Sequence, residues 1–164
     1  MKKHLSMHTP VHLFLTGGAR TWNTFTSKAL FQMLIRIYDS NSSSDPLKPK
    51  GLVLTYTWKV SYNAGGTTVH SALLMSFNKS HFLPLNKEML DTLSKLYDEL
   101  QLVFIDEAFL IGSLFLYSID NQLRNIKHVQ TKYFGNLDMI LCGDLYQAQP
   151  IQDSLIFEQP MVNM

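Results

Sequence analysis

The sequence predicts an α/β domain with a parallel β-sheet flanked by helices on both faces. Apolar runs that are typical of strands alternate with runs of helical periodicity, which is the pattern of such a sheet. The chain has 164 residues, of which 46% are hydrophobic, so it is long enough and apolar enough to fold around a core. Glycines or acidic residues follow three of the apolar runs directly, and parallel sheets bind ligands at the carboxyl ends of their strands.

The periodicity of the apolar residues places each element along the chain. Strands are expected at 11–16, 51–57, 102–107 and 137–144. Helices are expected at 23–38, 86–100 and 112–126. A further helix should follow the turn at Gly65 and Gly66, with Thr67 or Thr68 as its N-cap. Residues 39–51 are rich in Ser, Asp and Pro, which favours a loop.

Composition and charge limit the classes of function that this chain could have. The net charge of +1 gives no electrostatic reason to propose nucleic-acid binding and none to exclude it. Cys142 is the only cysteine, so no internal disulfide can form and an intracellular location is expected. The longest apolar run, 108–119, is shorter than the ~20 residues that span a bilayer, so no membrane partner is expected.

The segment that follows the first expected strand has the outline of a phosphate-binding loop. In the pattern G-x-x-x-x-G-K-[ST], backbone N–H groups wrap the phosphates, the lysine neutralises them and the hydroxyl binds Mg²⁺. Aligned to this pattern, "GGARTWNT" has Gly17 at the first glycine, Trp22 at the second, Asn23 at the lysine and Thr24 at the hydroxyl. A working nucleotide site, a decayed site and a coincidence of glycines all fit this segment alone.

Two further strand ends carry residues that suit phosphate chemistry. "LVFIDE" delivers Asp106 and Glu107, where the aspartate could hold Mg²⁺ and the glutamate could orient or deprotonate water. "ILCGDLYQ" delivers Asp144 and Gln147, which could reach a γ-phosphate from the neighbouring strand. Each end taken alone could equally be a strand that turns into solvent. The order of the three ends favours a nucleotide site.

Four motifs together resemble those of the Pif-family and Helitron-type DNA helicases of superfamily one, which translocate from 5′ to 3′. "GGARTWNT" is similar to their phosphate loop, which reads roughly G-G-A-G-T-G-K-S. "GGTTVHSAL", "VFIDEAFLIG" and "CGDLYQAQPI" resemble their motifs Ia, II and III. The resemblance covers roughly 11–157. It implies a three-layer RecA-like P-loop NTPase domain.

The resemblance also implies a role for each matching residue. Glu107 would activate water, Thr24 and Asp106 would hold Mg²⁺, and Gln147 would sense the γ-phosphate. The residues implied to contact ATP are Gly17, Gly18, Ala19, Thr21, Asn23, Thr24 and Asp144. The residues implied to lie near DNA are Thr67, His70 and Ser71. The implied cofactors are ATP and Mg²⁺, and the implied partner is single-stranded or forked DNA.

The sequence departs from the family pattern in the phosphate loop. Arg20 and Trp22 replace two glycines that let the backbone close on phosphate, and a Cβ obstructs this approach. Asn23 replaces the lysine, so the main positive charge on the phosphates is gone. We therefore expect a degenerate loop with weak or no ATP chemistry. Drift of an unselected gene copy and selection for a new ligand both fit this pattern.

The expected domain organisation is a single motor domain. Residues 1–10 would form a tail, 11–157 the RecA-like domain with motifs I, Ia, II and III, and 158–164 a second tail. The second motor domain of such helicases is expected to be absent, and a second polypeptide could supply it. The implied function is that of a nuclear or mitochondrial ATP-dependent DNA helicase in repair, recombination or telomere maintenance, present as a truncated and degenerate copy. The alternative is a non-catalytic RecA-fold module that binds nucleic acid or protein.

Overall fold

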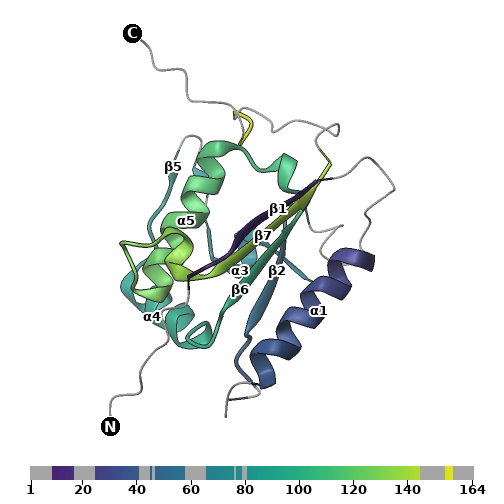
Figure 1. Ribbon diagram of the computed structural model, residues 1–164. Helices are drawn as coiled ribbons and strands as arrows, with labels where there is room; N and C mark the ends of the chain where they lie inside the picture. Colours follow the sequence, from purple (N-terminus) through teal and green to yellow (C-terminus); the bar gives the residue numbers. More distant parts are fainter. Residues whose placement is uncertain are drawn as a thin grey trace.

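A parallel sheet with helices on both faces forms the protein, which confirms the predicted fold class (Figure 1). The computed structural model describes residues 9–16, 25–40, 45, 47–57, 66–75, 77–78, 81–144 and 154–156. Among these residues, no helix combines the length and the apolar character needed to cross a membrane.

The central sheet has five parallel strands in the order β1-β7-β6-β2-β3. These strands are β1 (His12–Thr16), β2 (Gly51–Thr55), β3 (Thr67–Thr68), β6 (Leu102–Asp106) and β7 (Asp138–Gly143). The four longer strands match the predicted ones, with ends that differ by up to two residues. Because every strand runs in the same direction, all carboxyl ends lie at one edge of the sheet.

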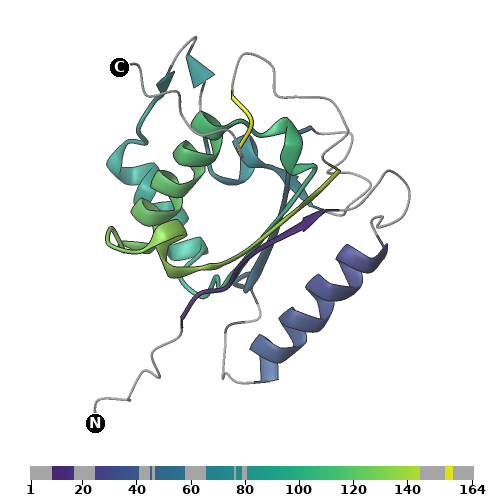
Figure 2. The same ribbon diagram turned by 45° about the horizontal axis from the view of Figure 1, so that its top comes forward.

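The helices cover the two faces of the sheet unequally (Figure 2). One face carries α1 (Phe25–Ser40), and the other carries α3 (Val69–Ala72), α4 (Lys87–Leu96) and α5 (Ser113–Lys127). The three predicted long helices are therefore present. The helix predicted after the glycine pair is the short α3, and Thr68 is its N-cap, with its side chain accepting a hydrogen bond from the Ser71 N–H.

Alternating side chains of the sheet build the two cores. In β6, Leu102 and Phe104 pack towards α1, while Val103 and Ile105 join the larger core under α3, α4 and α5. Successive side chains of a strand point to opposite faces, so a strand that is apolar throughout serves both layers. Cys142 of β7 lies on the α1 side and is buried, as expected for a small core residue.

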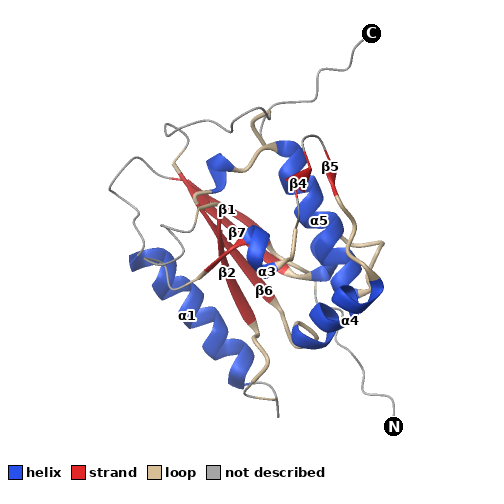
Figure 3. Ribbon diagram, turned by 180° about the vertical axis from the view of Figure 1, so that it is seen from behind, coloured by secondary structure: helices blue, strands red, loops and turns tan. Residues whose placement is uncertain are grey.

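The structure differs from the expected elements at one helix end and in several short pieces. The helix expected over 86–100 ends at Leu96, because the chain turns there towards β6. The Lys127 ammonium donates to the carbonyls of this turn, which are those of Tyr97, Asp98 and Leu100. The elements that the sequence did not predict are the short strand β3, the hairpin of β4 (Phe77–Asn78) and β5 (His81–Phe82), the 3-10 turn η1 (Ala108–Leu110) and the kinked turn η2 (Tyr133–Asn136) (Figure 3).

The carboxylate of Asp138 joins three segments at the amino end of β7. Its Oδ1 accepts the Val11 N–H at 2.8 Å, and its Oδ2 accepts the hydroxyl of Tyr38 near the end of α1. Burial, together with the hydrogen bond and the negative charge of Asp138, raises the pKa of Tyr38 far above its usual value. This contact fixes the end of α1 against the sheet at the edge opposite the strand carboxyl ends.

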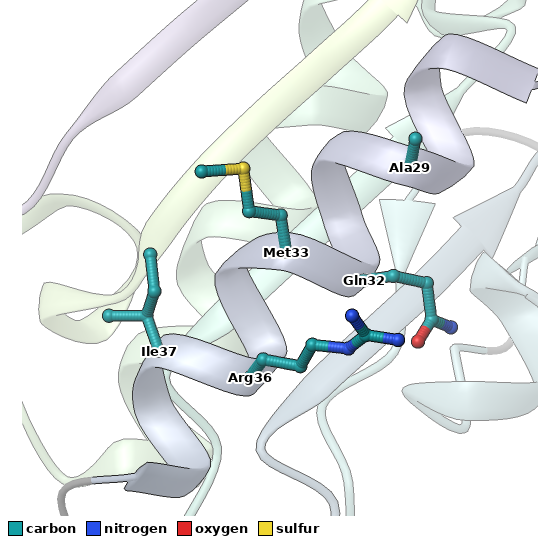
Figure 4. Close-up of a pocket in the computed structure, with 5 residues that line it drawn as sticks. All are labelled: Ala29, Gln32, Met33, Arg36 and Ile37. Carbon is teal, nitrogen blue, oxygen red and sulfur yellow. The ribbon is translucent and has the colours of Figure 1, made fainter.

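A hollow on the outer side of α1 does not belong to the predicted site. The residues that line it are Ala29, Gln32, Met33, Arg36 and Ile37 (Figure 4). All of them come from α1, and none of the acidic residues at the strand ends takes part. This hollow is therefore separate from the strand ends where the sequence predicts ligand chemistry.

Candidate functional site

The strand order brings three distant parts of the sequence to one edge of the sheet. β7 lies between β1 and β6, with Thr16 opposite Gly143 and Ile105 opposite Leu141 in register. Asp144 follows the end of β7 directly, and Asp106 is the last residue of β6. The acidic residues that the sequence placed at strand ends thus lie on adjacent strands, beside the end of β1.

Asp106 and Glu107 form a tight turn. The Glu107 N–H donates to Asp106 Oδ1 at 2.9 Å, and Glu107 itself has left-handed backbone angles, with φ 55° and ψ 44°. Such a conformation is unfavourable for a residue with a Cβ and is found preferentially at functional sites. Burial, and next the negative charge of Asp106, raise the pKa of Glu107. A glutamate with a raised pKa is a better base for water at neutral pH than an ordinary one.

The described carboxylates fit one half of a Mg²⁺–nucleotide site. Asp144 is only 6% exposed, and Asp106 is half-buried at the end of the neighbouring strand. Mg²⁺ prefers oxygen ligands and usually keeps several waters, binding through one or two carboxylates plus substrate phosphates. Within the described ranges, no group of three or more potential ligands could hold a metal ion by itself. The donor set therefore suits an ion that arrives with phosphate.

The other half of the predicted site lies outside the described residues. The predicted ATP and Mg²⁺ contacts concerned are Gly17, Gly18, Ala19, Thr21, Asn23, Thr24 and Gln147. Arg20 and Trp22, which set this segment apart from the family pattern, belong to the same undescribed segment. Their roles remain those that the sequence implied.

A packing contact that sequence analysis missed connects the acidic turn to the other strand ends. Phe109 in η1 is 4% exposed, and its ring lies against Gly143 at the end of β7. The same ring meets Phe14 of β1 edge to face, with centroids 6.5 Å apart. The sequence offered only an apolar "AFLIG" stretch as a signal, which does not reveal the partner of each side chain.

The residues predicted to contact DNA lie on and beside α3, at the far side of β2 from β6. Thr67 pairs with Leu54 in the short strand β3, and Ser71 is exposed on α3. The Thr68 hydroxyl donates to Ser71 Oγ at 2.9 Å. Thr67, His70 and Ser71 are therefore held on one short strand–helix junction.

The ring of His70 is part of an aromatic cluster. It stacks on Phe115 of α5 with centroids 5.0 Å apart and planes 26° apart, and Tyr56 lies 6.2 Å from it. Burial lowers the pKa of His70, which disfavours the positively charged form of the imidazole. The half-buried ring can still take part in stacking or hydrogen bonds.

Residues 3–158 match the family model described as PIF1-like helicase. The chain belongs to the PIF1-like helicase family. The ATP-dependent DNA helicase PIF1 of Candida albicans is 25% identical over 144 residues, which cover 86% of this chain and 15% of that protein. The corresponding protein of Saccharomyces cerevisiae is 24% identical over 142 residues, covering 85% of this chain and 16% of the relative.

A solved structure of this family shares the fold. The crystal structure of Pif1 helicase from Candida albicans superposes with a TM-score of 0.71 at 21% identity, covering 92% of this chain and 33% of that one. The PIF1-like chain described here thus spans less than a fifth of the curated relatives and about a third of the crystallised one.

Proposed function

We propose that residues 11–157 form the first motor domain of a PIF1-like ATP-dependent DNA helicase, with a phosphate loop that has lost most of its affinity for ATP. The observation that carries the proposal is the placement of Asp106, Glu107 and Asp144 on adjacent strand ends, beside the strand that leads into the segment 17–24. This is where an open parallel sheet binds nucleotides. A Pif1 helicase from Bacteroides has been crystallised in complex with ADP-AlF3 and ssDNA, and it shares this fold at a TM-score of 0.62.

The chemistry of the site would be divided among the strand ends. Asp106, together with Thr24, would hold Mg²⁺, which supplies charge neutralisation on the phosphates. Glu107 would take the proton of the attacking water, for which its raised pKa suits it. Asp144 and Gln147 would lie on the γ-phosphate side, because they follow the strand between β1 and β6.

The proposed weakness of the loop has a physical cause. Lysine at the position of Asn23 would contribute a full positive charge beside the terminal phosphates, and asparagine contributes only a dipole. Trp22 would place an indole where phosphate oxygens sit, and Arg20 replaces a glycine that would let backbone N–H groups approach. Arg20 stands at a different position of the loop sequence from the missing lysine, and we expect that its charge does not replace that of the lysine.

Calorimetry with Mg²⁺ and a slowly hydrolysed ATP analogue tests the proposal. The unmodified chain should bind poorly, whereas Arg20→Gly, Trp22→Gly and Asn23→Lys together should restore binding. A ligand present at 100 times its Kd adds ~2.7 kcal/mol to the free energy of unfolding, so a thermal shift gives an independent readout. Asn23→Lys alone should not suffice, because Trp22 still occupies phosphate space. Tight binding by the unmodified chain would refute the loss of affinity, and no binding by the triple revertant would refute the nucleotide site.

We further propose that the strand–helix junction at Thr67, His70 and Ser71 binds single-stranded DNA whether or not ATP binds. Another Bacteroides Pif1 structure is described as bound to ssDNA. The junction is held by contacts to β2 and α5, so a non-catalytic nucleic-acid module is the second candidate function. A nuclear or mitochondrial location would follow from a DNA partner, and a fluorescent fusion would test it.

Fluorescence anisotropy with a labelled oligonucleotide tests the DNA contact. His70→Ala should weaken binding about five-fold or more if the ring stacks on a base. Binding should also fall as salt rises, because phosphate contacts release counterions. Thr92→Ala on the exposed side of α4 is the matched control and should bind like the unmodified chain. Equal binding by the His70→Ala variant would remove this residue from the DNA site.

A further inference from the structure

The ring of Phe109 lies directly over Gly143 at the end of β7. A Cβ added to Gly143 would lie 2.3 Å from Phe109 Cε2 and 2.5 Å from Cζ, far inside contact distance. The ring therefore rests directly on the backbone of the strand, and only glycine permits this approach. Asp144, one of the acidic residues of the candidate site, is the next residue along the chain.

The same ring reaches the strand that leads into the phosphate loop. Phe14 of β1 meets it edge to face, with centroids 6.5 Å apart and planes 88° apart. Such a T-shaped pair is a preferred and directional aromatic contact. Phe14 lies two residues before the end of β1, so Phe109 touches β1 and β7 close to the two ends that frame the site.

The backbone between Glu107 and Phe109 leaves little freedom for independent movement. The Leu110 N–H donates to the Glu107 carbonyl at 3.1 Å, and the Ile111 N–H donates to the Ala108 carbonyl at 3.2 Å. Ala108 is fully buried. A shift of the Phe109 ring is therefore transmitted through one hydrogen-bonded turn to Glu107, whose left-handed backbone has to be held by its surroundings.

We infer that Phe109 is a positioning residue of the candidate nucleotide site, which sets the backbone of Asp106 and Glu107 relative to Asp144 and to the end of β1. The inference deepens the proposed function and rests on it for its role in nucleotide binding. The geometric part, that one ring holds three strand ends in place, stands on the contacts of the chain alone.

Gly143→Ala tests the geometric part, because its methyl group displaces the ring. In a chain that is otherwise unchanged, Gly143→Ala should move the backbone amide and Cα chemical shifts of Asp106 and Glu107, since these shifts report on φ and ψ. Gly51→Ala is the matched control. A Cβ there would also meet a ring and a side chain, at 2.7 Å from Phe31 Cζ and 2.1 Å from Ile35 Cδ1, but at the amino end of β2. It should leave the shifts of Asp106 and Glu107 unchanged.

The nucleotide part is tested in the background of the triple revertant of the loop. There, Gly143→Ala should weaken binding of the ATP analogue about ten-fold or more, and Gly51→Ala should leave it within about two-fold. Adding Phe109→Leu to Gly143→Ala makes room for the methyl group and should recover part of the affinity. If the triple revertant binds no nucleotide at all, the proposed function fails, and the chemical-shift comparison still decides the geometric part.

The outcomes that overturn the inference are specific. A folded Gly143→Ala variant with unchanged shifts at Asp106 and Glu107 would show that the ring does not set the acidic turn. Equal loss of affinity in the two glycine variants would show a general effect of destabilisation. If Gly143→Ala fails to fold, Phe109→Leu alone introduces no clash and serves in its place, with the same shifts expected to move.

Discussion

Tyr38 and Asp138 show how a single pair can fix the frame of the sheet away from the site. Asp138 accepts hydrogen bonds from the Tyr38 hydroxyl and from the Val11 N–H, so the end of α1 and the start of β1 are held to β7. Hydrogen bonds to a charged acceptor contribute more than neutral ones. The amino edge of the sheet is therefore anchored independently of any ligand at the carboxyl edge.

The raised pKa of Tyr38 predicts that the free energy of unfolding falls at high pH. The pKa of Tyr38 is raised in the folded state, first by burial and then by Asp138. Below pH ~10 the hydroxyl is protonated in the folded and unfolded states, so the contribution is complete. Above pH ~10, Tyr38 loses its proton more readily in the unfolded chain than in the folded protein, so stability falls as pH rises. Tyr38→Phe should cost about 1–3 kcal/mol at pH 7 and flatten the decline between pH 9 and 11, measured by urea unfolding.

Tyr117 provides the control for this measurement. Its side chain is 64% exposed on α5, so Tyr117→Phe should leave the free energy of unfolding at pH 7 unchanged, in contrast to Tyr38→Phe. A Tyr38→Phe variant with the same alkaline decline as the unmodified chain would contradict the assignment of the decline to Tyr38.

Single residues also mark the limit of what the sequence could predict of the site. The placement of Asp106 and Asp144 at strand ends can be predicted because acidic residues directly follow apolar runs, which is a local signal. Phe109 was not found, because its role depends on Gly143 and Phe14, which lie 34 and 95 positions away in the sequence. Nothing in an apolar stretch indicates which distant backbone a ring will cover.

At the scale of elements, the periodicity of apolar residues predicted most of the strands and helices, because each layer of the fold has to bury a defined face. The strands β6 and β7 are apolar on both faces, which only a sheet buried between helices needs. Helix ends were less predictable. The apolar repeat continues through Tyr97, but α4 ends at Leu96, and the carbonyls beyond it are satisfied by Lys127 of α5. A cap that comes from another helix leaves no trace in the local sequence.

This cap predicts that Lys127 contributes to stability through hydrogen bonds. Its ammonium donates to three carbonyls at 2.9 to 3.1 Å, and burial lowers its pKa. Lys127→Met keeps the length of the side chain but removes the donors, and it should lower the free energy of unfolding by about 1–3 kcal/mol. Lys95→Met, at an exposed position in the last turn of α4, is the matched control and should stay within about 0.5 kcal/mol of the unmodified chain. Equal effects of the two substitutions in chemical denaturation would contradict the proposed cap.

At the scale of the whole molecule, the strand order determines which strand ends lie next to one another, and no single motif does this. Placing β7 between β1 and β6 brings the end of the first strand next to acidic residues that come about 90 and 128 positions later. The described core residues lie on both faces of this arrangement. If the phosphate loop has changed while this arrangement of strands is kept, as we propose, restoring three residues should be enough to restore binding.

Restored binding should still not make this chain a helicase by itself. Strand separation requires one body of a motor to move against another when nucleotide binds, and the described sheet and its helices form one layered unit. The chain covers 33% of the crystallised Candida albicans Pif1. We expect the triple revertant, supplied with ATP and Mg²⁺, to bind nucleotide but to release no labelled strand from a forked duplex in a fluorophore–quencher assay. A full-length PIF1-like helicase serves as the positive control. Strand release by the revertant that depends on ATP would show that these 164 residues contain all that unwinding needs.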